Sequence, residues 1–321
     1  MPPQTSKTFL PSGRTQPRFA GLCTFLRAPH IDAVAPASRP IDWAIYGIPS
    51  DAGVTFRPGA RFGPRAVRAA SQYIKPYLIE QQVHLAEKLS IADAGDAPVS
   101  PYSCKQTLDD AAAFAQTLGE PGHTKLLAIG GDHSVAYANL KATWESRGKP
   151  AGGLAVVHFD AHMDTVDEVW GEKWGHASPF RRAIEAGYID PKSMISIGIR
   201  GTLNDPADLD YTRKLGVTLI TFDQWRKNGP QTLASFLGRI ARREAYLTFD
   251  VDAVDPAFCP GTGTPVAGGF TSFEALDAVR SLNGINLVGA DIVEVLPDRD
   301  VAEITATFAA QLMAEILGLS A

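Results

Sequence analysis

The sequence predicts an α/β fold, a three-layer α-β-α sandwich with a mostly parallel eight-stranded sheet. Two observations support this class. Short apolar runs of strand length alternate with longer amphipathic segments along most of the chain, a pattern typical of parallel strands joined by helices. The 321 residues, 45% of them hydrophobic, can also fill one large core. Helices should therefore cover both faces of the sheet, and ligands should bind outside the carboxyl ends of its strands.

The chain divides near residue 40. Residues 1–40 are rich in Pro, Ser and Thr and have no sustained periodicity, so we expect an extended N-terminal arm that lies over the domain or over a neighbouring subunit. Residues 41–321 contain no internal repeat, low-complexity tract or linker. They are therefore predicted to form a single domain.

Eight segments have the length and apolar character of strands. They are Trp43 to Gly47, Leu89 to Ala92, Lys125 to Ile129, Leu154 to Phe159, Met194 to Ile199, Val217 to Phe222, Ala245 to Phe249 and Ile285 to Ala290. Seven further segments have helical spacing. They are Pro64 to Tyr73, Leu108 to Leu118, Ser134 to Trp144, Pro179 to Ala186, Asp223 to Arg242, Ser272 to Leu282 and Val301 to Leu317.

Composition makes several partners improbable. Thirty basic and thirty-five acidic side chains give a net charge of -5, and no run of one sign is long enough to bind nucleic acid or an acidic membrane surface. The first twenty residues lack a signal-peptide core, and no apolar run approaches the roughly 20 residues that span a bilayer. Cys23, Cys104 and Cys259 are widely spaced and fit free thiols of a reducing compartment. We expect a cytoplasmic protein.

The apolar run 154–159 leads into a group of ionisable residues. Asp160, His162 and Asp164 follow at alternate positions, so a continued strand would place them on one face. Two carboxylates and an imidazole on one face need a positive charge between them. Residues two apart on a strand are roughly 6.5–7 Å apart, which suits two metal ions about 3.5–4 Å apart with Asp160 as a bridge.

Two further segments repeat this pattern. Asp250 and Asp252 follow another apolar run, and His133 follows two glycines that should allow a tight turn. Asp132 could orient a ligand or cap the next helix. An isolated Asp-x-Asp is usually a turn or a cap, but three such groups at three strand ends indicate one metal centre. Oxygen-rich ligation with two imidazoles favours manganese, with nickel, cobalt and iron as alternatives.

These motifs resemble those of the ureohydrolases, the family of arginase and agmatinase. The resemblance rests on GGDHS at 130–134, FDAHMD at 159–164 and TFDVDAVDPAFCPGTGTP at 248–265. The segments GEKWGHASPFRRAIEAG at 171–187 and DIVEVLP at 291–297 are more similar to agmatinase and guanidinobutyrase than to arginase. The resemblance implies an arginase-like fold and the hydrolysis of a guanidino compound to urea and an amine.

The resemblance also implies two divalent metal ions, Mn²⁺ or else Ni²⁺. One ion would be held by His133, Asp160, Asp164 and Asp250, and the other by Asp160, His162, Asp250 and Asp252. His158 would lie behind the ions as a supporting residue.

For catalysis, the resemblance implies three roles. His176 would be the proton shuttle, Asp164 would pass a proton to the leaving amine, and Glu294 would hold the planar guanidinium through its two carboxylate oxygens. Ala177 replaces the glycine usual after this histidine in the family, and Trp170 and Trp174 lie in the same loop. Substrate specificity is therefore least defined here.

Several alternatives remain at this point. Agmatine and 4-guanidinobutyrate are the first candidate substrates; guanidine, a methylated guanidine, a biguanide and guanidinopropionate are others. A metallophosphatase would need cationic phosphate clamps, which these motifs do not supply. A non-catalytic subunit of a ureohydrolase complex would lack ligands, whereas all six are present. The family likeness implies a homo-oligomer, a trimer or hexamer, or a hetero-oligomer with a homologue.

Overall fold

A central sheet organises the protein, whose computed structural model describes residues 7–321. All strand pairs in this eight-stranded sheet are parallel. In spatial order its strands are β4 (Ile91–Asp96), β1 (Trp43–Gly47), β5 (Lys125–Ile129), β10 (Asn286–Val293), β9 (Glu244–Asp250), β6 (Leu154–Phe159), β7 (Ile189–Ile199) and β8 (Thr218–Thr221). The predicted fold class is therefore confirmed, and all eight predicted strands are present.

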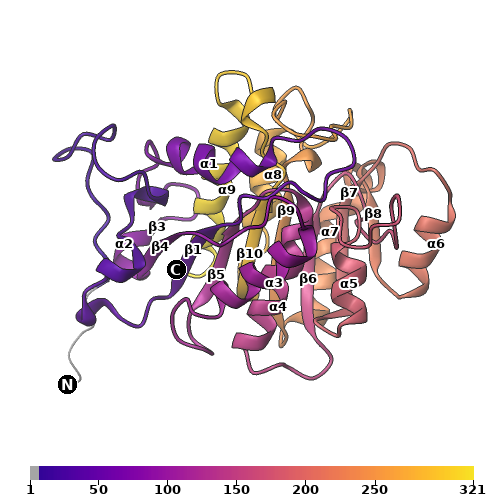
Figure 1. Cartoon of the computed structure of the whole chain (residues 1–321), viewed down its shortest axis with the longest axis horizontal. Helices are drawn as coiled ribbons and strands as arrows, with labels where there is room; N and C mark the ends of the chain where they lie inside the picture. The colour runs from indigo at the N-terminus through magenta and orange to yellow at the C-terminus, as the bar shows by residue number, and fades with distance from the viewer. Residues whose placement is uncertain (1–6) are drawn as a thin grey trace.

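Helices cover both faces of the sheet, as Figure 1 shows. One face packs on α1 (Gly63–Ser71), α7 (Phe222–Ile240), α8 (Ser272–Arg280) and α9 (Ile304–Gly318). The other face packs on α3 (Cys104–Ala115), α4 (Ala136–Ser146) and α5 (Pro179–Glu185). Alternate residues of each strand enter the two apolar layers: in β1, Trp43 and Ile45 face one layer while Ala44 and Tyr46 face the other. The central strands are largely apolar because both faces are buried.

Some short elements were not predicted. A hairpin joins β2 (Tyr77–Leu78) to β3 (Val83–His84), followed by α2 (Leu85–Lys88), and α6 (Ala207–Lys214) precedes β8. The hairpin strands are too short to show a period. Helix α6 buries only Thr212, so it has no apolar stripe for a sequence pattern to reveal. Strand β7 begins at Ile189 rather than Met194.

The N-terminal segment lies on the domain. It contains the short 3-10 helices η1 (Phe25–Arg27), η2 (Ile31–Ala33) and η3 (Pro36–Ser38). Phe25 is buried, and its N–H donates to the Asp93 carboxylate at 2.7 Å. Residues 1–6 of the predicted arm lie outside the described residues, and the division at residue 40 stays a prediction. No helix among the described residues is long and apolar enough to cross a membrane.

Candidate metal centre

Four neighbouring strands in the middle of the sheet, β5, β10, β9 and β6, end at one edge. Their carboxyl ends carry the predicted ligands. His133 begins the 3-10 helix η5 (His133–Val135) after β5, and Asp160 directly follows β6. Asp250 is the last residue of β9, and Asp252 lies in η6 (Val251–Ala253). Parallel pairing thus brings together residues that are far apart in the chain.

The backbone geometry at β6 differs from the prediction. The strand ends at Phe159, and residues 160–164 are irregular, so strand period does not align Asp160, His162 and Asp164. Instead, the Asp160 carboxylate accepts the N–H of His162 at 2.6 Å, which curls the chain. Asp164 has a left-handed φ of 52°, an unfavourable conformation for a non-glycine residue. The three side chains converge through this turn.

The glycines before His133 are needed for space rather than for a positive φ. A Cβ on Gly131 would lie 1.7 Å from the Ser50 carbonyl oxygen. Neither Gly130 nor Gly131 adopts a positive φ. The chain bends at Gly131, and close backbone approach explains why glycine is needed there.

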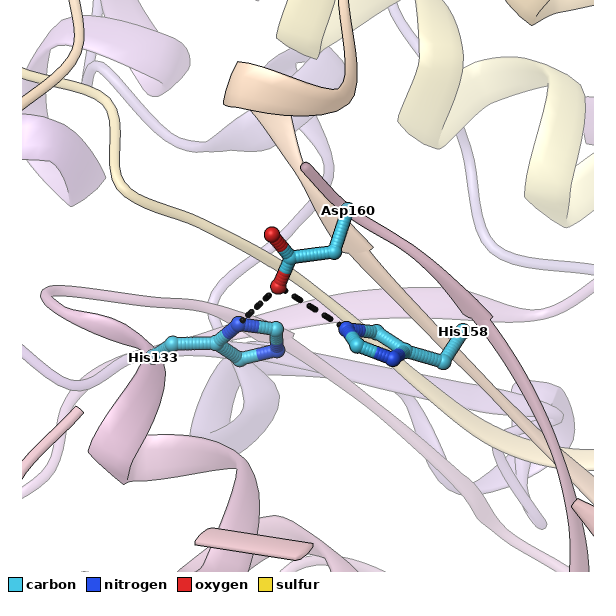
Figure 2. A group of neighbouring side chains, drawn as sticks. All are labelled: His133, His158 and Asp160. Atoms are coloured by element: carbon cyan, nitrogen blue, oxygen red, sulfur yellow. Dashed lines mark hydrogen bonds and ion pairs between the residues drawn. The ribbon is translucent and has the colours of Figure 1, made fainter. Parts of the chain in front are cut away.

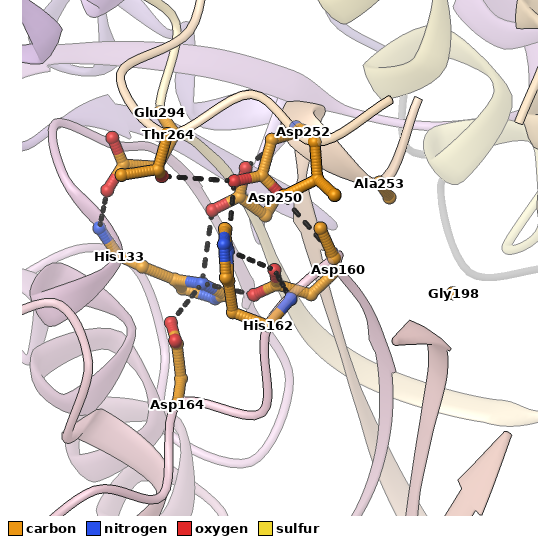
Figure 3. Close-up of polar contacts among 12 residues, drawn as sticks. His133, Asp160, His162, Asp164, Gly198, Asp250, Asp252, Ala253, Thr264 and Glu294 are labelled. Atoms are coloured by element: carbon orange, nitrogen blue, oxygen red, sulfur yellow. Dashed lines mark hydrogen bonds and ion pairs between the residues drawn. The ribbon is translucent and has the colours of Figure 1, made fainter. Parts of the chain in front are cut away.

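The ring nitrogen Nδ1 of His133 is the centre of the first group. It lies 3.0 Å from Asp160 Oδ2, 2.9 Å from Asp164 Oδ2 and 3.4 Å from Asp250 Oδ2 (Figure 3). Nevertheless this buried nitrogen has no hydrogen-bond partner of acceptable geometry. A single ring nitrogen cannot satisfy three carboxylates, so a cation in their midst would fit the arrangement better than a proton.

The second group forms around His162. Its Nδ1 lies 3.1 Å from Asp252 Oδ2 and 3.3 Å from Asp160 Oδ1. Asp160 therefore presents Oδ2 to His133 and Oδ1 to His162, as Figure 3 shows. Ligand atoms of Asp160, His162 and Asp252 lie within 4.8 Å of one another. With one oxygen toward each histidine, Asp160 could contribute to the binding of two ions.

His158 also contacts the central carboxylate. Its Nε2 lies 2.9 Å from Asp160 Oδ2, opposite His133 (Figure 2). The ligand atoms of His133, His158 and Asp160 also lie within 4.8 Å of one another. However, His158 Nδ1 lies 3.0 Å from the Ser196 hydroxyl. If that hydroxyl donates to Nδ1, Nε2 carries the proton and donates it to Asp160, which suits a supporting role.

A buried network of hydrogen-bonded side chains lies behind His133. Its Nε2 lies 2.9 Å from the Thr248 hydroxyl, which donates to Asp291 Oδ1 at 2.6 Å. The Tyr246 hydroxyl donates to Asp291 Oδ2, and Asn139 donates to the Tyr246 oxygen at 2.6 Å. Because Thr248 gives its only hydroxyl proton to Asp291, it must accept the Nε2 proton of His133. In the neutral ring, this tautomer directs the Nδ1 lone pair at the carboxylates.

The electrostatics of the site indicate a shortage of positive charge. Burial raises the pKa of Asp250 well above its usual range, and the Asp252 and Asp160 charges raise it further. Burial acts to lower the pKa of His162, but Asp252 and Asp160 outweigh it and raise that pKa to about 12. Divalent cations would supply the missing positive charge, and the four carboxylates and two imidazoles of the site offer the oxygen and nitrogen ligands that such cations bind.

His176 and Glu294 meet beside this centre. His176 Nδ1 lies 2.9 Å from Glu294 Oε1, and the Thr55 N–H donates to His176 Nε2 at 3.0 Å. Nδ1 therefore carries the ring proton and donates it to Glu294. Burial acts to lower the pKa of His176, but the hydrogen bond and charge of Glu294 outweigh it and raise that pKa to about 9. The Thr55 N–H requires a lone pair on Nε2 and so favours the neutral ring, and positive charge added to the cluster would also lower the pKa of His176.

Only one oxygen of Glu294 remains free. Oε1 accepts both the His176 proton and the His133 backbone N–H, the latter at 3.0 Å, whereas the buried Oε2 has no partner. Sequence analysis expected both oxygens to receive a guanidinium, whereas in the structure Oε2 alone is available for one. Glu294 also has a left-handed φ of 64°, which the surrounding contacts must sustain.

Asp132 caps the helix. Its Oδ1 accepts the Ser134 N–H at 2.9 Å, and its Oδ2 accepts the Gly53 N–H at 2.9 Å. Burial raises the pKa of Asp132 to about 6, with a further contribution from Glu294. Of the two roles considered from sequence, the structure shows the cap. Asp132 also holds the loop at Gly53, whose carbonyl accepts the His176 N–H at 3.0 Å.

Arg200, which sequence analysis missed, holds the loop after β9. Its guanidinium donates to five backbone carbonyls, including those of Asp252 at 2.6 Å, Ala253 at 3.1 Å and Val266 at 2.7 Å. An arginine directly after the buried strand β7 was the only signal in the sequence. Thr248 and Asp291 were missed too, although an Asp within an apolar strand is itself unusual.

Comparison with known proteins agrees with this geometry. The Arginase family model matches residues 41–318. The chain is 41% identical to guanidinopropionase from Pseudomonas aeruginosa (95% of this chain, 93% of the relative) and 35% identical to guanidinobutyrase from the same organism (95% and 94%). The structure of proclavaminate amidinohydrolase from Streptomyces clavuligerus is similar, with a TM-score of 0.86 and 38% identity over 95% of this chain and 99% of that one.

Proposed function

The chain belongs to the Arginase family, and on this premise we propose that it hydrolyses a C–N bond of a small guanidino compound, releasing urea and an amine. The observation that carries the proposal is the convergence of three carboxylates on the unpartnered Nδ1 of His133. Agmatine and 4-guanidinobutyrate are the first substrates to test.

The six predicted ligands are proposed to hold two divalent ions. His133, Asp160, Asp164 and Asp250 would surround one ion, and Asp160, His162, Asp250 and Asp252 the other. The contacts of His133 and His162 with opposite oxygens of Asp160 support this division. Manganese is the first choice because four carboxylates outnumber two imidazoles, with nickel as the alternative.

When bound, two divalent ions lower the pKa of water at the site and stabilise developing negative charge. Asp164 and His176 line a cavity of about 280 Å³ that opens over the cluster. Asp164 would carry a proton to the leaving amine, and His176, held by Thr55 and Glu294, would exchange protons with solvent. Glu294 Oε2 would accept one N–H of the substrate guanidinium.

Asp250→Asn tests the proposal. It should abolish urea release and weaken metal binding together, because the lost charge faces His133 at 3.4 Å. Asp255→Asn is a matched control: its carboxylate accepts the N–H groups of Ala257 and Gly268 at 2.9 and 2.6 Å instead of facing the cluster. Each variant is loaded with Mn²⁺ or Ni²⁺, and urea is measured colorimetrically. Full activity of Asp250→Asn would exclude the mechanism, as would a wild-type chain that releases no urea with either metal.

We also propose that the chain is a homo-oligomer, a trimer or hexamer. A cavity of about 990 Å³ lies between the N-terminal segment and helices α1, α8 and α9, and its lining includes exposed Phe19, Tyr73 and Ile79. A second copy of the chain would bury these side chains. Light scattering should give a multiple of 34.3 kDa, reduced by Ile79→Glu; a wild-type monomer, or an unchanged mass in this variant, would contradict the assignment. A hetero-oligomer with a homologue would need a second chain for activity.

A further inference from the structure

The cavity over the cluster has two chemically different parts. Its inner wall carries His162, Asp164, His176 and Asp250 of the candidate centre. The rest of the wall is largely apolar and comes mainly from residues 161–177 and 199–209. Its larger apolar side chains are Met163, Val166, Ile199, Leu203 and Leu209. A guanidinium placed at the centre would therefore direct its substituent against hydrocarbon.

The only other charged side chain in the lining is not free to bind a ligand. Every nitrogen of the Arg200 guanidinium already donates to backbone carbonyls, at 2.6–3.4 Å. A substrate carboxylate could pair with it only by displacing those bonds. Outside the candidate centre, the lining residues offer no unused acid for an ammonium group and no unused base for a carboxylate.

Each hydroxyl of the lining already has a protein partner as well. Thr55 contacts His176 Nε2 at 2.7 Å, Thr264 donates to Asp252 Oδ2 at 3.2 Å, and Thr221 caps helix α7 by accepting the Gln224 N–H at 3.2 Å. A charged group enclosed here would lose its hydration without gaining a partner of opposite charge, which is costly. The volume of about 280 Å³ is also at the small end of ligand sites.

We propose that this cavity selects a guanidine whose substituent is a short, uncharged alkyl group. The inference rests on the proposed function, since it concerns the tail of the same substrate. The apolar wall provides affinity for methylene groups, and the lack of a counter-charge disfavours both an ammonium and a carboxylate at the tail. Of the substrates considered from sequence, a methylated guanidine then ranks above agmatine and 4-guanidinobutyrate.

A series of matched four-carbon tails tests this inference. Urea release is measured with the metal-loaded full chain on butylguanidine, agmatine and 4-guanidinobutyrate, and then on methyl-, ethyl- and propylguanidine. Butylguanidine should have a kcat/KM at least about tenfold above both charged compounds, and each added methylene should raise kcat/KM about fourfold. A charged compound that equals or exceeds butylguanidine would overturn the inference. If no compound yields urea, the proposed function itself fails.

Variants of the apolar wall give a second measurement. Leu209→Glu should raise kcat/KM for agmatine relative to butylguanidine about tenfold or more, and Leu209→Lys should do the same for 4-guanidinobutyrate. Leu22→Glu is the control, because Leu22 is exposed and lies outside this cavity. Thermal unfolding checks that the variants are folded. If folded Leu209 variants keep the wild-type order of substrates, the wall does not contact the tail and the inference is wrong.

Discussion

Replacing Thr248 with valine would test the buried hydrogen-bond network behind His133. The Thr248 hydroxyl accepts the His133 Nε2 proton at 2.9 Å and donates to Asp291 at 2.6 Å. Valine has nearly the same shape, so it removes both hydrogen bonds without opening a cavity. His133 Nε2 would then be buried without an acceptor, and Asp291 would lose one of its two hydroxyl donors.

The size of the effect follows from these two bonds. The neutral bond contributes about 1 kcal/mol and the bond to the carboxylate about 1.5–3 kcal/mol, so the free energy of unfolding should fall by roughly 2–4 kcal/mol. Metal affinity should fall about 10–100-fold, the usual range when a residue that orients a ligand is lost. The reason is that His133 loses the contact that selects its tautomer and ring orientation.

Two measurements on the same variants test this reasoning. Urea-induced unfolding gives stability, and competition with a metal chelator gives Mn²⁺ affinity. Thr248→Ser keeps the hydroxyl and should retain affinity within about threefold. Thr107→Val, in α3, also loses two hydrogen bonds, to the N–H and carbonyl of Ser100 at 2.9 and 3.0 Å, and should lower stability alone. Normal Mn²⁺ affinity of Thr248→Val would refute the proposal that this hydrogen-bond network orients His133 for metal binding.

Three further outcomes are expected. His176→Ala should lower kcat about 10²–10⁴-fold with metal content retained; loss of the metal would instead make His176 structural. His158→Gln should weaken metal binding only about tenfold if His158 supports Asp160, whereas abolished binding would make it a ligand. Burial acts to raise the pKa of Glu315, but Arg280 outweighs it and lowers the pKa below the ordinary 4.5. The carboxylate therefore stabilises the fold above the unfolded-state pKa, and this contribution is lost as pH falls through the folded-state value. Glu315→Gln should flatten the acid dependence of stability measured by denaturant unfolding, and an unchanged acid profile would contradict this assignment.

The strands and the location of the site could be predicted because both depend on local patterns. Strands such as β6 and β9 are apolar on both faces, so each appears as a short continuous run followed by polar residues. The order of strands could not be predicted in this way. Strands β9 and β10 insert between β5 and β6, and this non-local pairing leaves no mark in local periodicity.

The details of the site were less predictable because they depend on backbone groups and individual atoms. Asp164 reaches His133 through a left-handed turn, whereas alternation of residue types suggested a strand. Glu294 gives one oxygen to His133 and His176, which residue type cannot reveal. Arg200 binds only carbonyls, and every residue has a carbonyl, so no motif identifies its partners.

The fixed position of the Arg200 side chain also keeps it from blocking the reaction cavity. Its head group is a guanidinium, the same chemical group that the proposed reaction cleaves, and it lies in the wall of the reaction cavity. A mobile arginine there would be a built-in competitor that enters the carboxylate cluster of its own protein. Saturating its nitrogens with peptide oxygens from residues 198, 252–254 and 266 prevents this self-inhibition. The same contacts hold the loop that carries Asp252, so a single side chain supports the cluster and is kept from occupying it.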